Sequence, residues 1–430
     1  MRLPDEAAGE LFRASSADTL PELRKLTLWN AGLTPAAARV LAAAGWRLEA
    51  LDLSGNDDLG AAGVAALVAA PTFALRRLAL QDCGLDAASL LTLAGAPWPL
   101  EELNLSHNDF SAAAAGPALA ALARHVGLRR LNVSFCELSA AGLKALAEAA
   151  WPALTHLRVG GGELGFFNGT HALGAAAFAG FPALVALDLS RMELGEAGAR
   201  LLASRRWTRL RKLSLAGCRL GDDGLAALAR GAWPALEVLD LSSNSLHAAA
   251  LYSVANAPWP LEELDLSAND FQSAAAAPAL AALSQLVGLR RLDLANCSLR
   301  AAGFKALVEV AWPALTYLCA RSAKPDFDGP LALGAAAFAG FPALEELELI
   351  GVHLGEAGAR LLASRRWARL KKLDVSFTQL GDAGLAALAR GVWPALESLD
   401  LRWNNLSAPP TLEAARRWAP ALETLRAIQG

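Results

Sequence analysis

Cysteine is scarce in this chain, with 5 residues among 430. An odd number of thiols does not suit a disulfide framework, so we expect a reducing compartment and assign the protein to the cytoplasm. Long apolar runs are also missing, since none reaches the roughly 18 residues that a membrane-spanning helix needs. Residues 1–20 hold no apolar core of a secretory signal. The sequence therefore predicts neither a membrane span nor a signal peptide.

Neither sign of charge is in large excess: the net charge is -3 and the isoelectric point is near 6.1. This balance implies no general attraction to nucleic acid or to a membrane surface. Catalytic patterns such as G-x-S-x-G, G-x-x-x-x-G-K-[ST] and H-E-x-x-H are absent. The 6 histidines are scattered, which does not suit a metal site. We therefore expect a protein that is not an enzyme, holds no cofactor or metal, and binds no nucleic acid.

One leucine pattern fills the chain instead: L-x-x-L-x-L-x-x-(N/C)-x-L, as in LEELNLSHNDF and LEVLDLSSNSL. Its first leucines stand at 23, 48, 75, 100, 128, 154, 184, 210, 236, 261, 289, 315, 344, 370, 396 and 422. Successive starts are 25 to 30 residues apart, and segments such as LGDDG and LGEAG open the stretches between them. Over nearly its whole length the chain resembles the leucine-rich-repeat family, in its ribonuclease-inhibitor-like subclass.

The resemblance implies an α/β fold, a leucine-rich-repeat solenoid or horseshoe of about 16 repeats. Parallel β-strands would line its concave face and short helices its convex face. The alternation of residues agrees, because Leu239 and Leu241 would enter the core while Asp240 between them faces outward. Since one repeat alone would expose its leucines, neighbouring repeats must stack to bury them.

A longer period lies above the single repeat. PWPLEELNLSHNDF at 97–110 returns as PWPLEELDLSANDF at 258–271, an offset of 161 residues that later becomes 160. The sequence therefore predicts an internal duplication, with a first block at 97–257 and a second block at 258–406. We expect one solenoid domain over 23–430, preceded by a helical N-terminal cap over 1–22.

The ninth position of the repeat alternates between cysteine and asparagine. Its members include Cys83, Cys136, Cys218, Cys297, Asn56, Asn108, Asn244, Asn269 and Asn404. The resemblance implies that this side chain is an internal strut, bonding backbone groups where the chain turns away from the strand. Tryptophans that precede proline just before a repeat, such as Trp151 and Trp233, are predicted to be core residues.

Outward-facing positions that break the repeat consensus are the candidate binding residues. On the strands and the turns after them these are Trp29, His107, Phe135, His156, Arg158, Arg191, Tyr317, Arg321, Phe377, Arg402 and Trp403. Phe135 and Phe377 are large apolar groups at places usually given to small or polar residues, which is typical of binding hot spots.

The stretch VGGGELGFFNG at 159–169 matches the glycine spacing of a dinucleotide loop. It is also the sixth repeat, and the matching place in the second block, CARSAKPDFDGPL, has no glycine triplet. We therefore interpret both stretches as repeats enlarged by insertions. Because insertions into a regular array often bind ligands, Phe166, Phe167 and Phe327 form a second set of candidates.

The predicted function is that of a non-catalytic scaffold, binding a protein partner through the concave face and the two insertions. A column of outward acids that includes Asp240, Asp265 and Asp374 favours a basic partner. Alternatives are an activator of a small GTPase, or a substrate-receptor or sensor fragment of a longer protein. The ending LETLRAIQG offers no clear polar cap, so end-to-end self-association is a further expectation.

Overall fold

The computed structural model describes residues 20–161, 177–322 and 331–427. Contacts between residues divide the chain into two compact units, Met1–Cys218 and Arg219–Gly430. The predicted cap over 1–22 lies almost wholly outside the described residues, as do all three insertion candidates, Phe166, Phe167 and Phe327.

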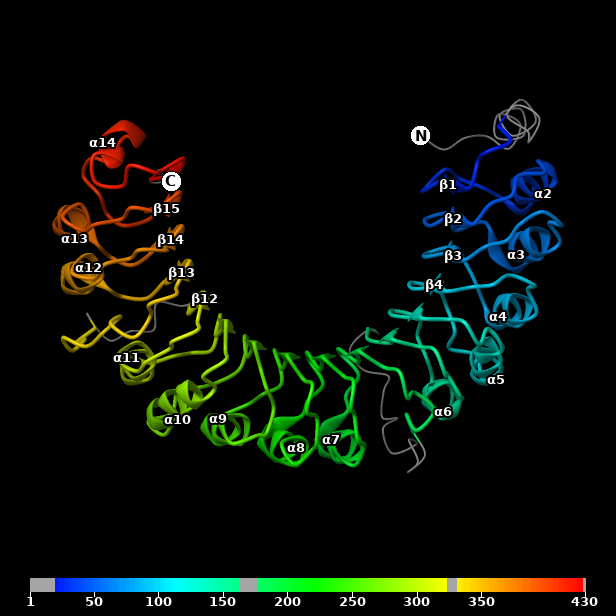
Figure 1. Cartoon of the computed structure of the whole chain (residues 1–430), viewed down its shortest axis with the longest axis horizontal. Coiled ribbons are helices and arrows are strands. Elements are labelled where there is room, and N and C mark those ends of the chain that lie inside the picture. Colours follow the sequence, from blue (N-terminus) through cyan, green and yellow to red (C-terminus); the bar gives the residue numbers. More distant parts are fainter. Residues whose placement is uncertain (1–19, 162–176, 323–330, 428–430) are drawn as a thin grey trace. The chain divides into compact units, whose positions relative to one another are not determined.

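The first unit alternates short strands with short helices (Figure 1). Its elements are β1 (Lys25–Thr27), α2 (Pro35–Ala43), β2 (Ala50–Asp52), α3 (Gly60–Val68), β3 (Arg77–Ala79), α4 (Ala87–Ala94), β4 (Glu102–Asn104), α5 (Ala115–Ala121), β5 (Arg130–Asn132), α6 (Ala140–Glu148), β6 (His156–Arg158), β7 (Ala186–Asp188), α7 (Gly195–Ala203) and β8 (Lys212–Ser214).

The second unit follows the same plan. Its elements are α8 (Gly221–Leu228), β9 (Val238–Asp240), α9 (Ala248–Ala255), β10 (Glu263–Asp265), α10 (Ala276–Ala282), β11 (Arg291–Asp293), α11 (Ala301–Glu309), β12 (Tyr317–Cys319), β13 (Glu346–Glu348), α12 (Gly355–Ala363), β14 (Lys372–Asp374), α13 (Gly381–Leu388), β15 (Ser398–Asp400), α14 (Leu412–Arg416) and β16 (Thr424–Arg426).

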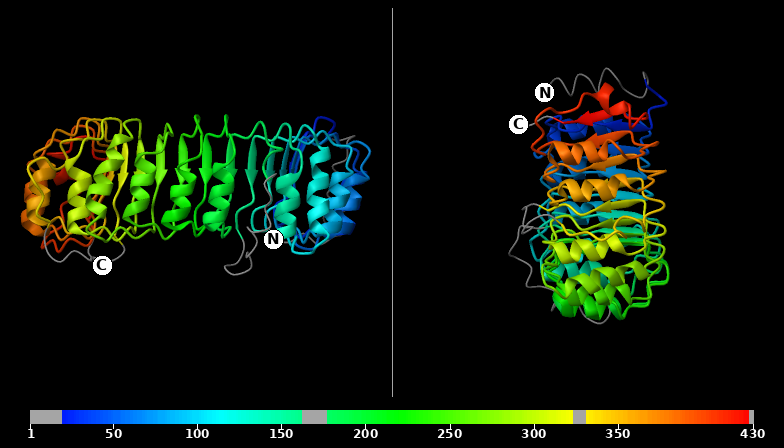
Figure 2. Two further views of the ribbon diagram at one scale, coloured as in Figure 1. Left: turned by 90° about the horizontal axis from the view of Figure 1, so that it is seen from below. Right: turned by 90° about the vertical axis from the view of Figure 1, so that its left-hand side faces the viewer.

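Within each unit the strands are parallel and follow one another in chain order. The register places like positions together, for example Leu103 beside Leu131 and Leu264 beside Leu292. In each unit the helices lie on one side of the strands (Figures 1 and 2). The other side, which carries side chains but no helix of the described residues, is called the open face here. These parallel strands and short helices confirm the predicted solenoid fold.

The core of each unit lies between strands and helices. Leu239 and Leu241 are buried there while Asp240 is only half-buried, as the alternation predicts. The tryptophans before proline are buried as predicted, and the indole N–H of Trp151 donates to the carbonyl of Leu146 at 3.1 Å. Trp312 and Trp393 donate in the same way to Leu307 and Leu388, so each of these three rings satisfies a carbonyl group that a helix terminus leaves unpaired.

The ninth-position side chains join neighbouring repeats inside the core. The Oδ1 atom of Asn56 accepts from the backbone N–H groups of Ala31 and Leu33, at 3.0 and 2.9 Å. Its amide nitrogen donates to the carbonyl oxygens of Leu28 and Leu53, at 3.0 and 2.6 Å. Since these backbone groups are shielded from water, Asn56 satisfies four groups that would otherwise be costly to bury. The predicted role as an internal strut is confirmed.

Cysteine fills the same position with fewer bonds. The thiol of Cys83 donates to the carbonyl of Leu53 at 3.1 Å, and the thiol of Cys136 to that of Leu105 at 3.1 Å. A thiol has one weak donor and a weak acceptor, so it satisfies fewer backbone groups than an amide does. Asn108 in the next repeat accepts from the backbone N–H of Cys83 at 3.0 Å, the same bond to a preceding repeat that Asn56 makes to Ala31.

We expect Asn56→Ala to lower the free energy of unfolding by about 3 kcal/mol, since buried N–H and C=O groups lose their partners. Cys83→Ala, at the same position of the next repeat, is the matched control and should cost only about 1–2 kcal/mol. Urea unfolding of the full chain, followed by circular dichroism, measures both. Equal losses for the two variants would contradict the strut's dependence on the amide.

Candidate functional site

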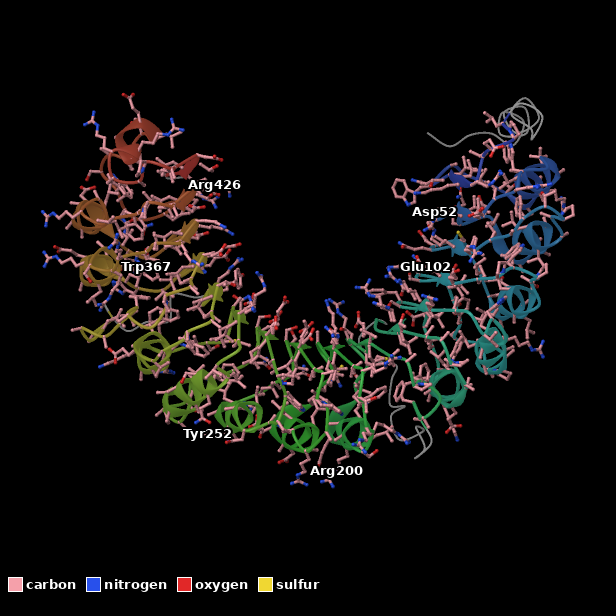
Figure 3. The ribbon with its side chains drawn as sticks, viewed as in Figure 1. Asp52, Glu102, Arg200, Tyr252, Trp367 and Arg426 are labelled. Atoms are coloured by element: carbon pink, nitrogen blue, oxygen red, sulfur yellow. The ribbon has the colours of Figure 1, made fainter. Side chains whose placement is uncertain are left out.

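The open face is built from the same few positions in each repeat. Counted from the first leucine, positions 3 and 5 lie on the strand and positions 7 and 8 on the turn that follows. Figure 3 shows Asp52 and Glu102 on the open face, whereas Arg200 and Tyr252 project on the helix side. Because these positions recur in each repeat, a surface built from them extends across several strands.

Position 8 has an unusual backbone conformation. Its φ is positive in most repeats, for example 52° at Asp82 and 55° at Ser243. This left-handed region suits glycine, asparagine and aspartate, and it is an outlier for bulky side chains. Four aromatic residues nevertheless occupy it: His107, Phe135, Phe377 and Trp403, with φ of 58°, 56°, 57° and 61°. Strained conformations of this kind tend to gather at functional sites.

In the first unit, His107 and Phe135 form a stacked pair, called the first-unit aromatic pair. Their ring centroids are 4.6 Å apart with an interplanar angle of 14°. Phe135 is 41% exposed. Its ring lies over Gly161, where an added Cβ would come within 2.6 Å of it. At Gly160 an added Cβ would meet the carbonyl oxygen of Ser190 at 2.5 Å. These two glycines thus admit an aromatic ring and a neighbouring backbone.

In the second unit, Phe377 and Trp403 form the second-unit aromatic pair. Their ring centroids are 5.3 Å apart with an interplanar angle of 18°. The two residues are 49% and 44% exposed. Each ring therefore covers part of its neighbour and leaves a large apolar area in contact with water.

The duplicated blocks provide an internal comparison for these positions. The first-unit pair, His107 and Phe135, corresponds to Ala268 and Asn296 in the second block. The second-unit pair corresponds conversely to Gly217 and Ser243 of the first block. The backbone is the same in both cases, with φ between 55° and 63° at these four small or polar residues. The repeat folds with small residues at position 8, so folding does not require the four aromatics.

The charged side chains at positions 2 and 3 pair across neighbouring strands. Arg130 lies 3.8 Å from Glu102, Arg290 lies 3.3 Å from Glu262, and Lys371 lies 2.7 Å from Glu345. These pairs are largely exposed, so each contributes little to stability, on the order of 0–1 kcal/mol. The charges at these positions are thus already matched within the chain.

Position 5 carries a row of acids in the second unit. Its members are Asp240, Asp265, Asp293, Glu348, Asp374 and Asp400. The aspartates shape the turn after the strand, as when Asp240 accepts from the backbone N–H of Ser242 at 3.0 Å. Burial raises the pKa of Asp374 above its usual range, and the negative charges of Asp400 and Glu348 add to that rise. The row therefore includes carboxylates that repel one another.

Several of the predicted binding residues are engaged within the chain. Arg158 lies 3.7 Å from Asp188, and the imidazole of His156 lies 2.9 Å from the hydroxyl of Thr155. Arg402 donates to both carboxylate oxygens of Asp400.

Tyr317 is similarly engaged, because the guanidinium of Arg291 lies 4.0 Å from the centroid of its ring. Trp29 is 67% exposed, as predicted, but no described aromatic ring stacks on it. Arg191 and Arg321 are exposed on the turns of their repeats. The structure thus brings four of the predicted residues together as two pairs, sets Arg402 beside the second pair, and leaves the others apart from these pairs.

The thiols lie away from the solvent. Burial raises the pKa of Cys83, Cys136 and Cys319 to about 12, which leaves them protonated and poorly nucleophilic near neutral pH. In the described part of the chain, no group of three or more His, Cys, Asp or Glu side chains could hold a metal ion. No helix there is both long enough and apolar enough to cross a bilayer.

The sequence pointed to the four aromatics singly but not to their pairing. The available signal is their spacing, since each pair stands at the same position of two consecutive repeats. Parallel strands in register bring such residues about 4.8 Å apart, which is within stacking distance. The left-handed backbone at position 8 was not predicted at all.

We expect the double variant Phe377→Gly with Trp403→Ser, which restores the residues of the first block, to change the free energy of unfolding by less than about 1 kcal/mol. Relief of left-handed strain offsets the lost ring contact. Phe304→Ala is the control, because this wholly buried ring should cost about 3–5 kcal/mol. Urea unfolding distinguishes the two. A loss above about 2 kcal/mol for the double variant would make the pair a structural element.

Five segments match a sequence model of the Leucine Rich repeat: residues 48–68, 99–115, 128–147, 208–229 and 370–389. A search among curated proteins finds no match. Among solved structures, the chain is similar to one in the TLR13–ssRNA13 complex, with 20% identity, 99% of this chain and 55% of that chain covered, and a TM-score of 0.51. It is also similar to one in the mouse RP105/MD-1 complex, with 18% identity, 94% and 66% covered, and a TM-score of 0.58.

The chain thus spans 55% and 66% of the lengths of these two structural relatives. At such identities the likeness concerns the fold alone. The matched segments, together with the repeated strand and helix, support placing this chain in the leucine-rich-repeat family.

Proposed function

We propose that this protein is a non-catalytic scaffold that binds a protein partner through its open face. The observation that carries the proposal is the stacked, exposed aromatic pair in each unit, His107 with Phe135 and Phe377 with Trp403. Exposed rings at strained backbone positions contribute little to the stability of the free protein. They become favourable when a partner covers them.

The physical argument rests on burial. Each aromatic side chain can bury on the order of 150–250 Å² against a partner, which makes such residues the commonest anchors of interfaces. Stacking holds each ring in place before binding, so less side-chain entropy is lost when the partner docks. Trp29, Arg191 and Arg321 extend the same open face within their own units as contributors to specificity.

The fold has precedent in such complexes, since a similar structure comes from the mouse RP105/MD-1 complex. Activation of a small GTPase and substrate reception in a longer protein remain narrower predictions, as does end-to-end self-association. The subclass resembling ribonuclease inhibitor and the cytoplasmic location likewise remain predictions.

We expect immobilised full-length protein to capture a partner from native lysate, identified by mass spectrometry. Capture should fall at least about tenfold when one aromatic pair is replaced by its counterpart from the other block, because hot-spot residues carry most of the binding energy. The variants are His107→Ala with Phe135→Asn, and Phe377→Gly with Trp403→Ser.

Tyr252→Ala is the matched control, since Tyr252 is 41% exposed but belongs to α9 on the helix side. It should leave capture unchanged. If both aromatic-pair variants recover the same proteins in the same amounts as the parent, the open face is not the binding surface. Unfolding curves for each variant separate lost binding from lost folding.

A further inference from the structure

The second-unit aromatic pair and Asp374 beside it form, we propose, a binding site for an arginine-bearing segment of a protein partner. The guanidinium pairs with Asp374, while its methylene stem and the neighbouring residue of the segment cover the rings of Phe377 and Trp403. This inference rests on the proposed function and adds the chemistry of the partner at one place on the open face.

Three carboxylates meet at this place. The register of β13, β14 and β15 sets Glu348 opposite Asp374, and Asp374 opposite Asp400. Adjacent parallel strands are about 4.8 Å apart, and like charges directly opposite one another destabilise a sheet. A cation brought by a partner would relieve that repulsion.

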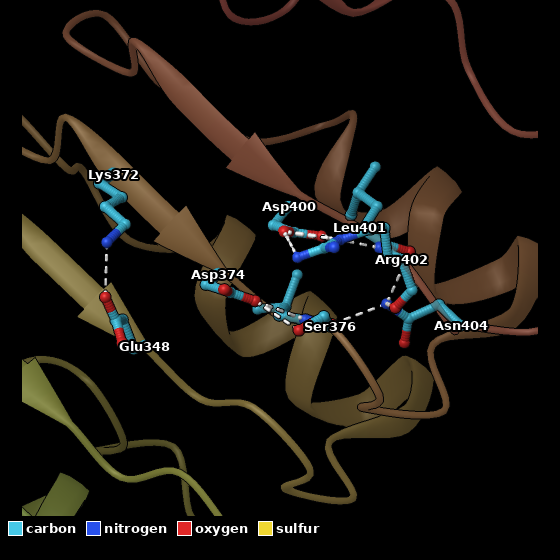
Figure 4. A network of polar contacts seen from close by, with 9 residues as sticks. Glu348, Lys372, Asp374, Ser376, Asp400, Leu401, Arg402 and Asn404 are labelled. Carbon is cyan, nitrogen blue, oxygen red and sulfur yellow. Dashed lines mark hydrogen bonds and ion pairs between the residues drawn. The ribbon is translucent and has the colours of Figure 1, made fainter. Parts of the chain in front are cut away.

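Two of the three carboxylates already have a cation (Figure 4). Lys372 lies 2.6 Å from Glu348, and Arg402 binds Asp400 through its Nε and Nη2 atoms, the latter at 2.7 Å. Each of these cations is bonded first to its own acid, and the charge of Asp374 is a smaller influence that also raises the pKa of both.

Asp374 is the carboxylate of the three that is not hydrogen-bonded to a cation of the described residues. It accepts from the backbone N–H of Ser376 at 3.0 Å and from the hydroxyl of Ser376 at 2.7 Å. Both bonds go to its Oδ1 atom, and among the described residues Asp374 makes no ion pair. Its Oδ2 atom can therefore accept from a partner, and the carboxylate is only half-buried.

The two blocks differ at this place in at least five residues. Where the second block has Asp374, Ser376, Phe377, Arg402 and Trp403, the first block has Ser214, Ala216, Gly217, Ser242 and Ser243. Asp374, Phe377 and Trp403 are each unfavourable to the isolated fold, through like-charge repulsion or through a bulky side chain in the left-handed region. Three such residues on two neighbouring repeats suggest one ligand that uses them together.

An arginine side chain fits this combination better than the alternatives. Its planar guanidinium can donate two hydrogen bonds to one carboxylate and can also stack on an aromatic face, whereas lysine offers a single compact, strongly hydrated charge. Asp374 and Phe377 are three residues apart at the end of β14, within about 10 Å, so one side chain and its neighbour reach both. A nucleic acid or an acidic peptide would bring its negative charge against Asp374.

The test uses the full-length chain and fluorescein-labelled peptides of alternating Arg-Gly, Lys-Gly or Glu-Gly, with a single-stranded oligo-dT as the nucleic-acid probe. Fluorescence anisotropy gives the affinities. We expect the Arg-Gly peptide to bind several-fold tighter than Lys-Gly, and both to bind far tighter than Glu-Gly or oligo-dT. Asp374→Ser should weaken Arg-Gly binding about tenfold, and so should Phe377→Gly with Trp403→Ser.

The control is Tyr252→Ala on the helix side, which should leave Arg-Gly affinity within about twofold. The inference is overturned if Arg-Gly fails to bind, if both second-unit variants bind it like the parent, or if oligo-dT or Glu-Gly binding depends on those residues. Should partner capture from lysate still require Phe377 and Trp403, the scaffold function would stand without the arginine preference. If neither Arg-Gly binding nor partner capture depended on Phe377 and Trp403, the proposed scaffold function would be overturned as well.

Discussion

The buried backbone groups at the turn after each strand constrain everything else in the repeat. Where the chain leaves the strand, its N–H and C=O groups face the core and can reach no water. Asn108 accepts from the N–H groups of Cys83 and Leu85, and it donates to the carbonyls of Leu80 and Leu105. One side chain thus ties two repeats together, and position 9 is fixed to an inward direction by this task.

The inward residue at position 9 determines the backbone conformation of its neighbour at position 8. With position 9 turned into the core, position 8 takes a left-handed conformation in most repeats and its side chain faces the solvent. Such a position suits glycine or asparagine, and the chain uses Gly217 and Asn296 there. The strain per residue is small, about 1–2 kcal/mol, and a large solenoid tolerates it at a few repeats. The side chain at position 8 can therefore be replaced by an aromatic one, which can serve binding, without a change in the core.

The sequence predicted the features that a strict period carries. Leucine alternation gave the strands and their buried side, and the proline-linked tryptophans gave the core. What it missed depends on geometry between repeats. The pairing of Arg402 with Asp400 occurs within one strand end, and the stacking of Phe377 on Trp403 joins two. The ion pair leaves no periodic signal, and the stacking leaves only the shared position of its two rings in consecutive repeats.

The duplication that the sequence predicts would explain how one fold can carry two unlike surfaces. Most core leucines and several struts, such as Asn244 and Asn404, recur between the blocks, whereas several positions of the open face differ. At position 5, Asn104, Asn132 and Ser214 of the first block correspond to Asp265, Asp293 and Asp374 of the second. Burial, followed by the charge of Asp265, raises the pKa of Asp293. The acids of the second block therefore lower the stability of the free protein at neutral pH. A partner that brings positive charge to this row recovers that energy on binding, whereas an uncharged partner does not.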